Sequence, residues 1–137
     1  MIRDLYDKSI VAYKTGTRQT VKLVTDTIRM ARRKEKVTAE LQLHSDQGFQ
    51  YTSSTYFGIT QAYGISPSMS RRGNPYDNAM AENFFSILKC ECLYRRKPQT
   101  KAQARKMIDA FIWFYNHIRL QTATGMPPSE MRAQAVS

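Results

Sequence analysis

The chain has 137 residues, enough for a substantial buried core, and we predict one domain over residues 1–137. Lys and Arg outnumber Asp and Glu by 21 to 11, a net charge of +10 that favours nucleic acid over a small-molecule substrate. Apolar runs stay short of the roughly 20 residues that span a bilayer, no signal-peptide pattern opens the chain, and the cysteines suit neither a disulfide nor a zinc site. We therefore expect a cytoplasmic protein that does not enter a membrane.

The predicted elements alternate between strands and helices. Residues 2–14 indicate a hairpin, with strands over 2–6 and 10–13 around a turn at 7–9. Helical spacing of apolar residues predicts helices over 20–33 and 53–63, and short apolar runs predict strands over 39–44 and 65–69. A loop over 68–76 precedes a long helix over 77–93, a helix from 100 to about 117 and a short helix from 128. This order predicts an α/β fold, a mixed sheet with helices packed on it.

Two carboxylates occupy positions that suit a shared metal ion. Asp46 directly follows a predicted buried strand, and open sheets place their ligands at the carboxyl ends of strands. Glu82 falls in the second turn of the helix over 77–93, away from the apolar arc that we expect to face the core. Carboxylates on separate rigid elements are the ligands that hold Mg²⁺ or Mn²⁺ in phosphodiester chemistry. Spacing alone favours the alternative, in which Asp46 caps a turn and Glu82 is an exposed helix glutamate.

Basic clusters in two loops are candidates for phosphate contacts. Arg71 and Arg72 lie in the loop before the predicted catalytic helix, and Arg95, Arg96 and Lys97 lie in the linker after it. A solvated basic surface remains the alternative for both clusters.

Other polar and aromatic residues also have structural interpretations. We place His44 in the second shell around Asp46, whereas His117 reads as a surface histidine at a helix end. Trp113, with its aromatic neighbours, is expected in the core or at a partner interface. Asn116 and Arg119 either brace the fold or read DNA.

Three motifs carry a family resemblance. They are His44-Ser-Asp46-Gln-Gly48-Phe-Gln-Tyr51, Gly73-Asn-Pro-Tyr-Asp77-Asn-Ala-Met-Ala-Glu82-Asn-Phe-Phe85, and Phe114-Tyr115-Asn116-His-Ile-Arg119. Together they resemble the DDE-type transposases of bacterial insertion sequences, whose catalytic core is shared with retroviral integrases. Thirty-five residues separate Asp46 from Glu82, the separation of the second and third acidic ligands in that family.

The resemblance implies a fold, a reaction and a set of site residues. It implies a ribonuclease-H-like mixed sheet flanked by helices, with Asp46 and Glu82 as catalytic ligands of Mg²⁺ or Mn²⁺. The implied reaction is hydrolysis of a DNA 3′ end followed by its transfer into target DNA, that is, DNA integration and recombination. Lys89, two turns after Glu82 on the same helix face, matches a position that contacts the DNA end.

The chain departs from the family at its start. In the family the first catalytic aspartate lies on a strand upstream of a hairpin, and this sequence begins inside that hairpin, so Asp4 and Asp7 align with hairpin positions. We expect the fold to lack most or all of the first strand and the metal site to lack one carboxylate. Weak metal binding and poor catalysis by this chain alone follow. The uncovered sheet edge favours pairing with a second copy as a homodimer.

Two further functions fit parts of the pattern. One is a non-enzymatic fragment that binds DNA or interferes with a full-length transposase. The other is a ribonuclease-H-like nuclease acting on RNA·DNA hybrids, which we expect to carry a fuller acidic cluster. Cleavage that depends on Glu82, and the choice between duplex DNA and hybrid, separate the three.

Overall fold

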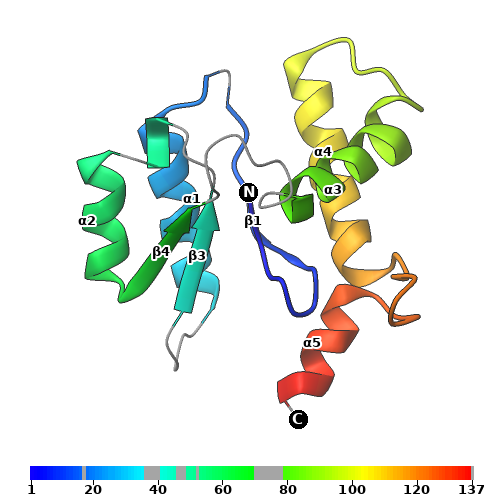
Figure 1. Cartoon of the computed structure of the whole chain (residues 1–137). Coiled ribbons are helices and arrows are strands. Elements are labelled where there is room, and N and C mark those ends of the chain that lie inside the picture. The colour runs from blue at the N-terminus through cyan, green and yellow to red at the C-terminus, as the bar shows by residue number, and fades with distance from the viewer. Residues whose placement is uncertain (17, 36–40, 46–48, 52, 70–78, 137) are drawn as a thin grey trace. The chain divides into compact units, whose positions relative to one another are not determined.

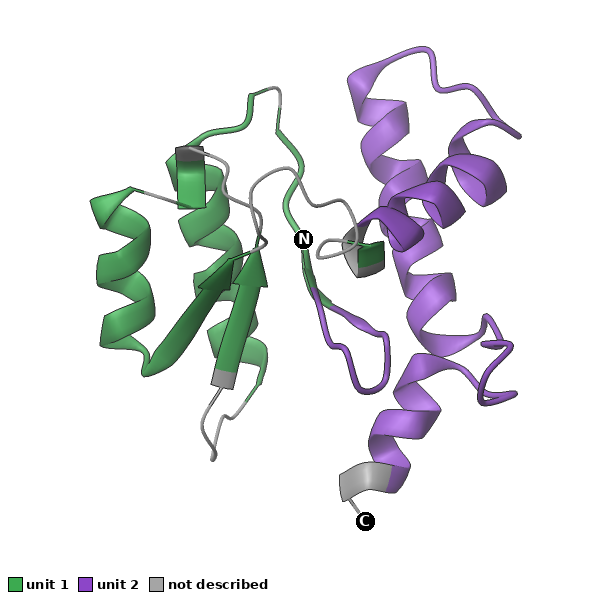
Figure 2. Cartoon of the chain, in the orientation of Figure 1, with its two compact units in different colours: residues 1–2, 11–79 green, residues 3–10, 80–137 purple. Residues whose placement is uncertain are grey.

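The computed structural model describes residues 1–16, 18–35, 41–45, 49–51, 53–69 and 79–136 (Figure 1). The chain divides into two compact units (Figure 2). Unit 1 contains residues 1–2 and 11–79, and unit 2 contains residues 3–10 and 80–137. The single domain over residues 1–137 stays a prediction.

The N-terminal hairpin is shorter than its sequence pattern predicts. Strand β1 (Ile2–Arg3) pairs with β2 (Ile10–Ala12). The first strand does not continue through Leu5 and Tyr6, because the Asp4 carboxylate accepts a hydrogen bond of 2.7 Å from the Tyr6 backbone N–H and turns the chain out of the strand. Leu5 and Tyr6 are 57% and 63% exposed. Lys8 completes the turn with a positive φ of 68°.

Unit 1 packs two helices against a parallel strand pair. Helix α1 (Val21–Lys34) is capped by the Thr20 hydroxyl, which accepts from the Leu23 N–H, and α2 (Ser54–Ala62) is capped in the same way by Ser53. Strands β3 (Leu41–Ser45) and β4 (Ile65–Met69) pair in parallel register, with His44 opposite Ser68. The short 3₁₀ helix η1 (Phe49–Tyr51) lies between β3 and α2 along the chain. The buried centre of this unit is Ile28, Tyr56 and Ile59.

Unit 2 is built from helices. Helix α3 (Ala79–Leu88) continues into the π-helical turn η3 (Lys89–Leu93), and α4 (Lys101–His117) is capped by Thr100 as its sequence predicts. Helix α5 (Pro128–Val136) follows. Phe84 is buried and its ring meets that of Tyr115 edge-on, with centroids 5.1 Å apart.

The apolar arc predicted for the helix over 77–93 is only partly buried. Phe84 and Leu88 are buried as expected, but Phe85 is 45% exposed. The two phenylalanines lie about 100° apart on an α-helix, and the side chain of Phe84 alone points to α4. The first two residues of the predicted helix, Asp77 and Asn78, either of which can cap it, lie outside the described residues.

Candidate active site

The first predicted carboxylate follows a strand end that is held in the core of unit 1. Strand β3 ends at Ser45, whose side chain is buried, and β4 runs parallel beside it. Burial raises the pKa of Tyr56, and the interaction of its hydroxyl with Ser45 offsets part of that rise. Asp46 itself lies outside the described residues, so its role as a ligand stays a prediction. The residue directly before Asp46, Ser45, is held in position because it is buried at the end of β3.

His44 links the two strands of unit 1. Its Nδ1 lies 3.0 Å from the Ser68 Oγ, the residue opposite it in the parallel register. His44 is exposed and directly precedes Ser45, the last residue of β3. This contact between the two strands is compatible with the predicted supporting role of His44 beside Asp46. That role stays a prediction, because Asp46 lies outside the described residues.

The second predicted carboxylate is presented to solvent by a helix whose other side is buried. Glu82 is exposed on α3. Phe84 and Leu88, which anchor this helix, lie about 200° and 240° around it from Glu82 at 100° per residue. No other residue in the described part of the chain forms an ion pair with Glu82. Its carboxylate is therefore on an open face of a fixed helix.

Lys89 shares that open face. It is seven residues after Glu82, so the two lie within about 20° of each other around the helix and about 10 Å apart along it. Lys89 is exposed and is the first residue of η3. The residues between Glu82 and Lys89 are therefore α-helical, and the angle of 100° per residue applies to them. The predicted carboxylate on α3 and the predicted cation at the start of η3 thus lie on one side of the continuous helix.

The donor chemistry of Asp46 and Glu82 fits a hard divalent cation. Both are carboxylates, the ligands preferred by Mg²⁺ and Mn²⁺. Within the part of the chain that the structure describes, there is no group of three or more His, Cys, Asp or Glu side chains that could hold a metal ion. The predicted pair includes Asp46, outside that part, and remains the candidate.

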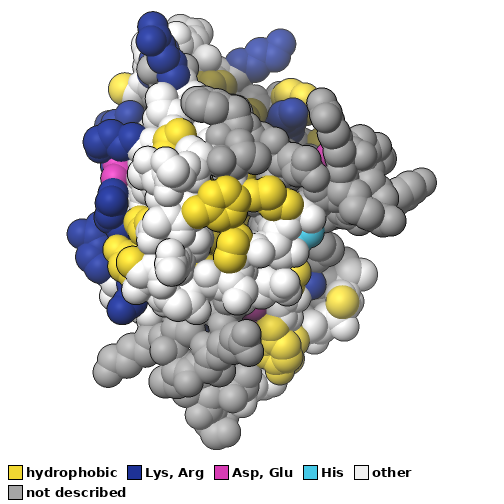
Figure 3. All heavy atoms as spheres, turned by 60° about the vertical axis from the view of Figure 1, so that its left-hand side comes forward, with side chains coloured by type: hydrophobic (Ala, Val, Ile, Leu, Met, Phe, Trp, Pro, Cys, Tyr) yellow, Lys and Arg dark blue, Asp and Glu magenta, His cyan; other side chains and the backbone are white. Residues whose placement is uncertain are grey.

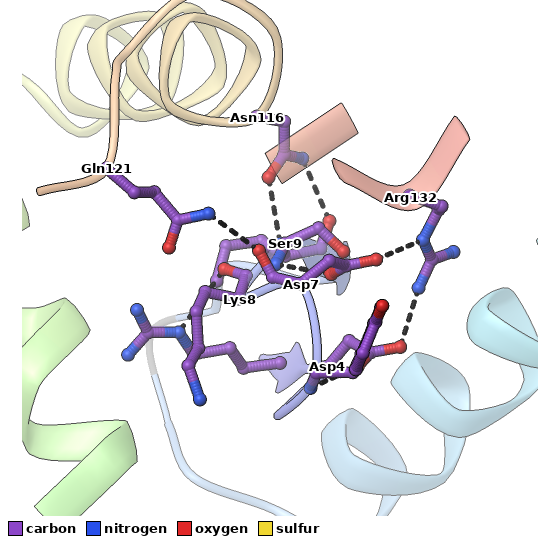
Figure 4. A network of polar contacts seen from close by, with 10 residues as sticks. Asp4, Asp7, Lys8, Ser9, Asn116, Gln121 and Arg132 are labelled. Carbon is purple, nitrogen blue, oxygen red and sulfur yellow. Dashed lines mark hydrogen bonds and ion pairs between the residues drawn. The ribbon is translucent and has the colours of Figure 1, made fainter. Parts of the chain in front are cut away.

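Asp4 and Asp7, the acidic residues of the hairpin, are occupied by Arg132 of α5 (Figure 4). The Arg132 Nε donates to the Asp7 Oδ2 at 2.6 Å, and its Nη2 donates to the Asp4 Oδ2 at 2.8 Å. The other Asp7 oxygen accepts from the Ser9 backbone N–H at 2.8 Å. Asp7 is only 2% exposed. These carboxylates hold the hairpin, in agreement with their alignment to hairpin positions.

The late motif braces the same hairpin. The Asn116 side chain accepts from the Ile10 backbone N–H at 2.8 Å and donates to the Ile10 carbonyl at 3.0 Å (Figure 4). The Gln121 amide donates to the Asp7 carbonyl at 2.8 Å. The Tyr115 hydroxyl accepts from Arg3 and donates to the Lys8 carbonyl. Of the two interpretations of this motif, the structure supports bracing of the fold.

Arg119 forms an ion pair that the sequence pattern does not reveal. Its guanidinium binds the Glu91 carboxylate through Nε and Nη2, with a shortest distance of 2.7 Å. The hydrogen bond from Arg119 holds the pKa of Glu91 below its usual value. Glu91 lies in η3, so this pair fixes the π-helical turn to the end of α4.

The basic linker is exposed beside a shallow groove. Arg95, Arg96 and Lys97 are all solvent-accessible, as phosphate contacts require. Arg95 and Arg96, with Lys106 of α4, line a groove of about 480 Å³ whose apolar wall includes Phe111. Their contact with DNA stays a prediction, and Arg71 and Arg72 lie outside the described residues.

Near the end of α4 the structure excludes a core position for Trp113 and agrees with the prediction for His117. Phe111 is buried, but Trp113 is 58% exposed, so Trp113 is not a core residue. Its ring lies 5.0 Å from that of His117, centroid to centroid. His117 is exposed at the helix end, as expected of a surface histidine.

Comparisons with known families converge on one domain type. Two family profiles, each described as an integrase core domain, match residues 1–75 and residues 63–128. Within the described residues no helix has the length and apolar content needed to cross a membrane.

Curated relatives carry the names of transposases. An uncharacterized transposase-like protein of Haemophilus influenzae is 36% identical over 137 residues, which is 99% of this chain and 63% of the relative. The transposase for insertion sequence element IS904 of Lactococcus lactis is 40% identical over 87% of this chain and 47% of its own length. The putative transposase InsK for IS150 of Escherichia coli is 34% identical over 96% of this chain and 47% of its own length. The chain thus spans about half the length of the curated relatives it matches.

Solved structures show the same fold. A simian T-cell lymphotropic virus intasome in complex with the PP2A regulatory subunit B56 gamma matches with a TM-score of 0.80 and 18% identity, over 94% of this chain and 45% of that chain. The HTLV-2 integrase catalytic core domain in complex with magnesium matches with a TM-score of 0.73 and 14% identity, over 94% of this chain and 80% of that chain. The predicted α/β, ribonuclease-H-like fold is confirmed.

Proposed function

Because the chain belongs to the integrase core domain family of insertion-sequence transposases, we propose that it is a catalytic core for cutting a DNA end and joining it to target DNA. The observation that best supports the reaction is the position of Glu82, exposed on the open face of a helix whose opposite side is anchored by Phe84. Asp46, directly after the end of β3, is the proposed second member of the site.

Asp46 and Glu82 would hold Mg²⁺ or Mn²⁺, as carboxylates on separate elements do in phosphodiester-cleaving sites. An ion bound there strengthens a water nucleophile and offsets charge on the scissile phosphate. The HTLV-2 core of the same fold is described in complex with magnesium, which supports this choice of ion.

The chain's own cations complete the proposed site. Lys89, the first residue of η3 and on the same helix face as Glu82, is proposed to contact a phosphate of the DNA end. Arg71, Arg72, Arg95, Arg96 and Lys97 are proposed to contact the DNA backbone. His44 supports the strand end before Asp46 through its contact with Ser68.

The family's first carboxylate is proposed to come from a strand upstream of β1. Asp4 and Asp7 do not replace it, because both are bonded to Arg132. A site with two carboxylates in place of three compensates less of the ion's dehydration, so we propose that this chain alone binds the metal weakly and cleaves poorly.

Self-association is part of the proposal. The HTLV-2 integrase core is described in dimeric and trimeric forms. We propose that this chain forms a homodimer on DNA, since strand transfer joins two DNA ends.

The experiment is nicking of supercoiled plasmid in Mn²⁺ by this chain and by a version extended upstream with a strand that carries an aspartate. We expect the extended protein to nick and the 137-residue chain to nick at least about tenfold more slowly, because one charge is missing from the site. Equal rates would contradict the missing ligand. Binding of DNA with no nicking by either protein would favour a non-enzymatic DNA-binding fragment, and a preference for an RNA·DNA hybrid would favour a nuclease.

A further inference from the structure

A stripe of charged residues runs along α1 in unit 1. Lys22, Asp26, Arg29 and Arg33 are spaced at i, i+4, i+7 and i+11, so they fall within an arc of about 60° of the helix. The stripe is about 17 Å long at 1.5 Å per residue. Figure 3 shows Lys and Arg side chains gathered in a band along one edge, with an acidic side chain among them.

Asp26 orders the cations of this stripe. Its carboxylate accepts from Lys22 at 2.7 Å, from Arg29 at 3.1 Å and from Lys14, which approaches from outside the helix, at 3.2 Å. The hydrogen bonds from Lys22 and Lys14 lower the pKa of Asp26 to about 2, so it is ionised at neutral pH. Together with Arg33, one carboxylate among four cations leaves an excess of three positive charges, and the contacts with Asp26 position the side chains of Lys14, Lys22 and Arg29.

The stripe is exposed, whereas the other side of α1 is buried. The side chain of Lys22 is 82% exposed and that of Arg29 is 51% exposed. Val24 and Ile28, on the opposite side of the helix, pack in the core of unit 1. The ion pairs with Asp26 are therefore solvated, and such pairs contribute little to stability. A fold-stabilising role does not account for so linear a set of cations.

We propose that the cations of this stripe, Lys22, Arg29 and Arg33, together with the neighbouring Lys14, contact the phosphate backbone of duplex DNA. The proposal rests on the proposed function and adds to it a DNA contact on α1 of unit 1, made by residues other than those of the basic clusters at 71–72 and 95–97. The match is one of charge and length: phosphates on one strand repeat every 3.4 Å along the axis, so about 17 Å spans about five of them. Contacts of this kind position DNA without reading its sequence.

The test is binding of a fluorescein-labelled 30-base-pair duplex of arbitrary sequence to the 137-residue chain, by anisotropy over a range of salt concentrations. The variant Lys22→Gln/Arg29→Gln/Arg33→Gln is expected to lower the slope of log K against log salt by about 2 to 3, because each lost phosphate contact removes about 0.9. Asp26→Asn is expected to tighten binding at low salt, because it removes a negative charge that faces the phosphates.

The control is Lys34→Gln, which removes one positive charge from the same helix, about 100° or more from each of the three substituted cations. We expect it to change the slope by no more than about one contact, and circular dichroism checks that each variant is folded. A triple variant with the affinity and slope of Lys34→Gln would overturn the proposal. Plasmid nicking by Glu82→Gln tests the proposed active site separately. If the triple variant binds DNA like the control, the proposed active site is unaffected. If Glu82→Gln still nicks, the measured contribution of the stripe to DNA binding is unaffected.

Discussion

Glu82→Gln in the upstream-extended protein is expected to reduce Mn²⁺-dependent plasmid nicking by about three orders of magnitude, the size of effect seen when one preorganised electrostatic contact to a reacting group is removed. The substitution keeps the size of the side chain and removes its charge, so the metal loses an anionic ligand. Because Glu82 is exposed on α3, the fold should be unaffected. Rates of plasmid relaxation, followed on gels, measure the effect.

The control for this change is Glu130→Gln. Glu130 is also an exposed glutamate in the first turn of a helix, α5. Its substitution removes the same charge at a position far along the chain from the proposed ligands. It should nick at the unmodified rate. If Glu82→Gln retained activity within about tenfold of the parent, as Glu130→Gln is expected to do, Glu82 would not be a metal ligand.

Arg132→Met is expected to lower the free energy of unfolding by about 2 to 3 kcal/mol, because it leaves the buried Asp7 carboxylate without its charged partner, whereas the partly exposed pairing with Asp4 contributes little. Asp7, at 2% exposure, would keep a buried carboxylate oxygen with no cation beside it. Asp4 would lose its pairing at the same time. Urea unfolding followed by circular dichroism measures the change at pH 7.

Two companion variants show whether the loss comes from this contact. Arg105→Met removes an exposed arginine from α4 and should stay within about 0.5 kcal/mol of the parent. Asp7→Asn in the Arg132→Met background removes the unpaired charge and should recover part of the lost stability, which makes the two changes non-additive. Additive losses would show that Arg132 and Asp7 do not act as a pair.

The helices of this chain are largely predictable because their signals are local. Thr20, Ser53 and Thr100 each cap the helix that follows, with the side-chain oxygen accepting a backbone N–H in the first turn. Gly64 ends α2 with a positive φ of 68°, which costs glycine nothing. The parallel pairing of β3 with β4 follows from a strand, helix, strand order.

The differences arise where contacts distant in sequence decide the outcome. Arg132 reaches Asp7 across 125 residues, and Asn116 reaches Ile10 across 106, so no local pattern indicates either contact. The π-helical turn η3 is likewise invisible to a 3.6-residue period, although it places Glu91 against Arg119. The predicted first strand ended early because Asp4 bonds to its own backbone neighbour.

The candidate site was found by motif and not by geometry. Thirty-five residues between two acids allow a shared ion or two unrelated surface carboxylates, and the spacing does not choose. The structure adds an exposed helix face that carries Glu82 on α3 and Lys89 at the start of η3, and the buried Ser45 directly before Asp46. It also shows that Asp4 and Asp7 are engaged elsewhere.

The central claim, that Asp46 and Glu82 share one divalent ion, is tested most directly by Mn²⁺ binding to this chain, measured by electron paramagnetic resonance. The titration compares the parent with Asp46→Asn, Glu82→Gln and the double variant at millimolar Mn²⁺. If the two carboxylates hold one ion, each single change should remove most of the binding and the double change should add little to either, since coupled residues are not additive. Losses that add as independent terms, or single variants that bind like the parent, would contradict the shared site.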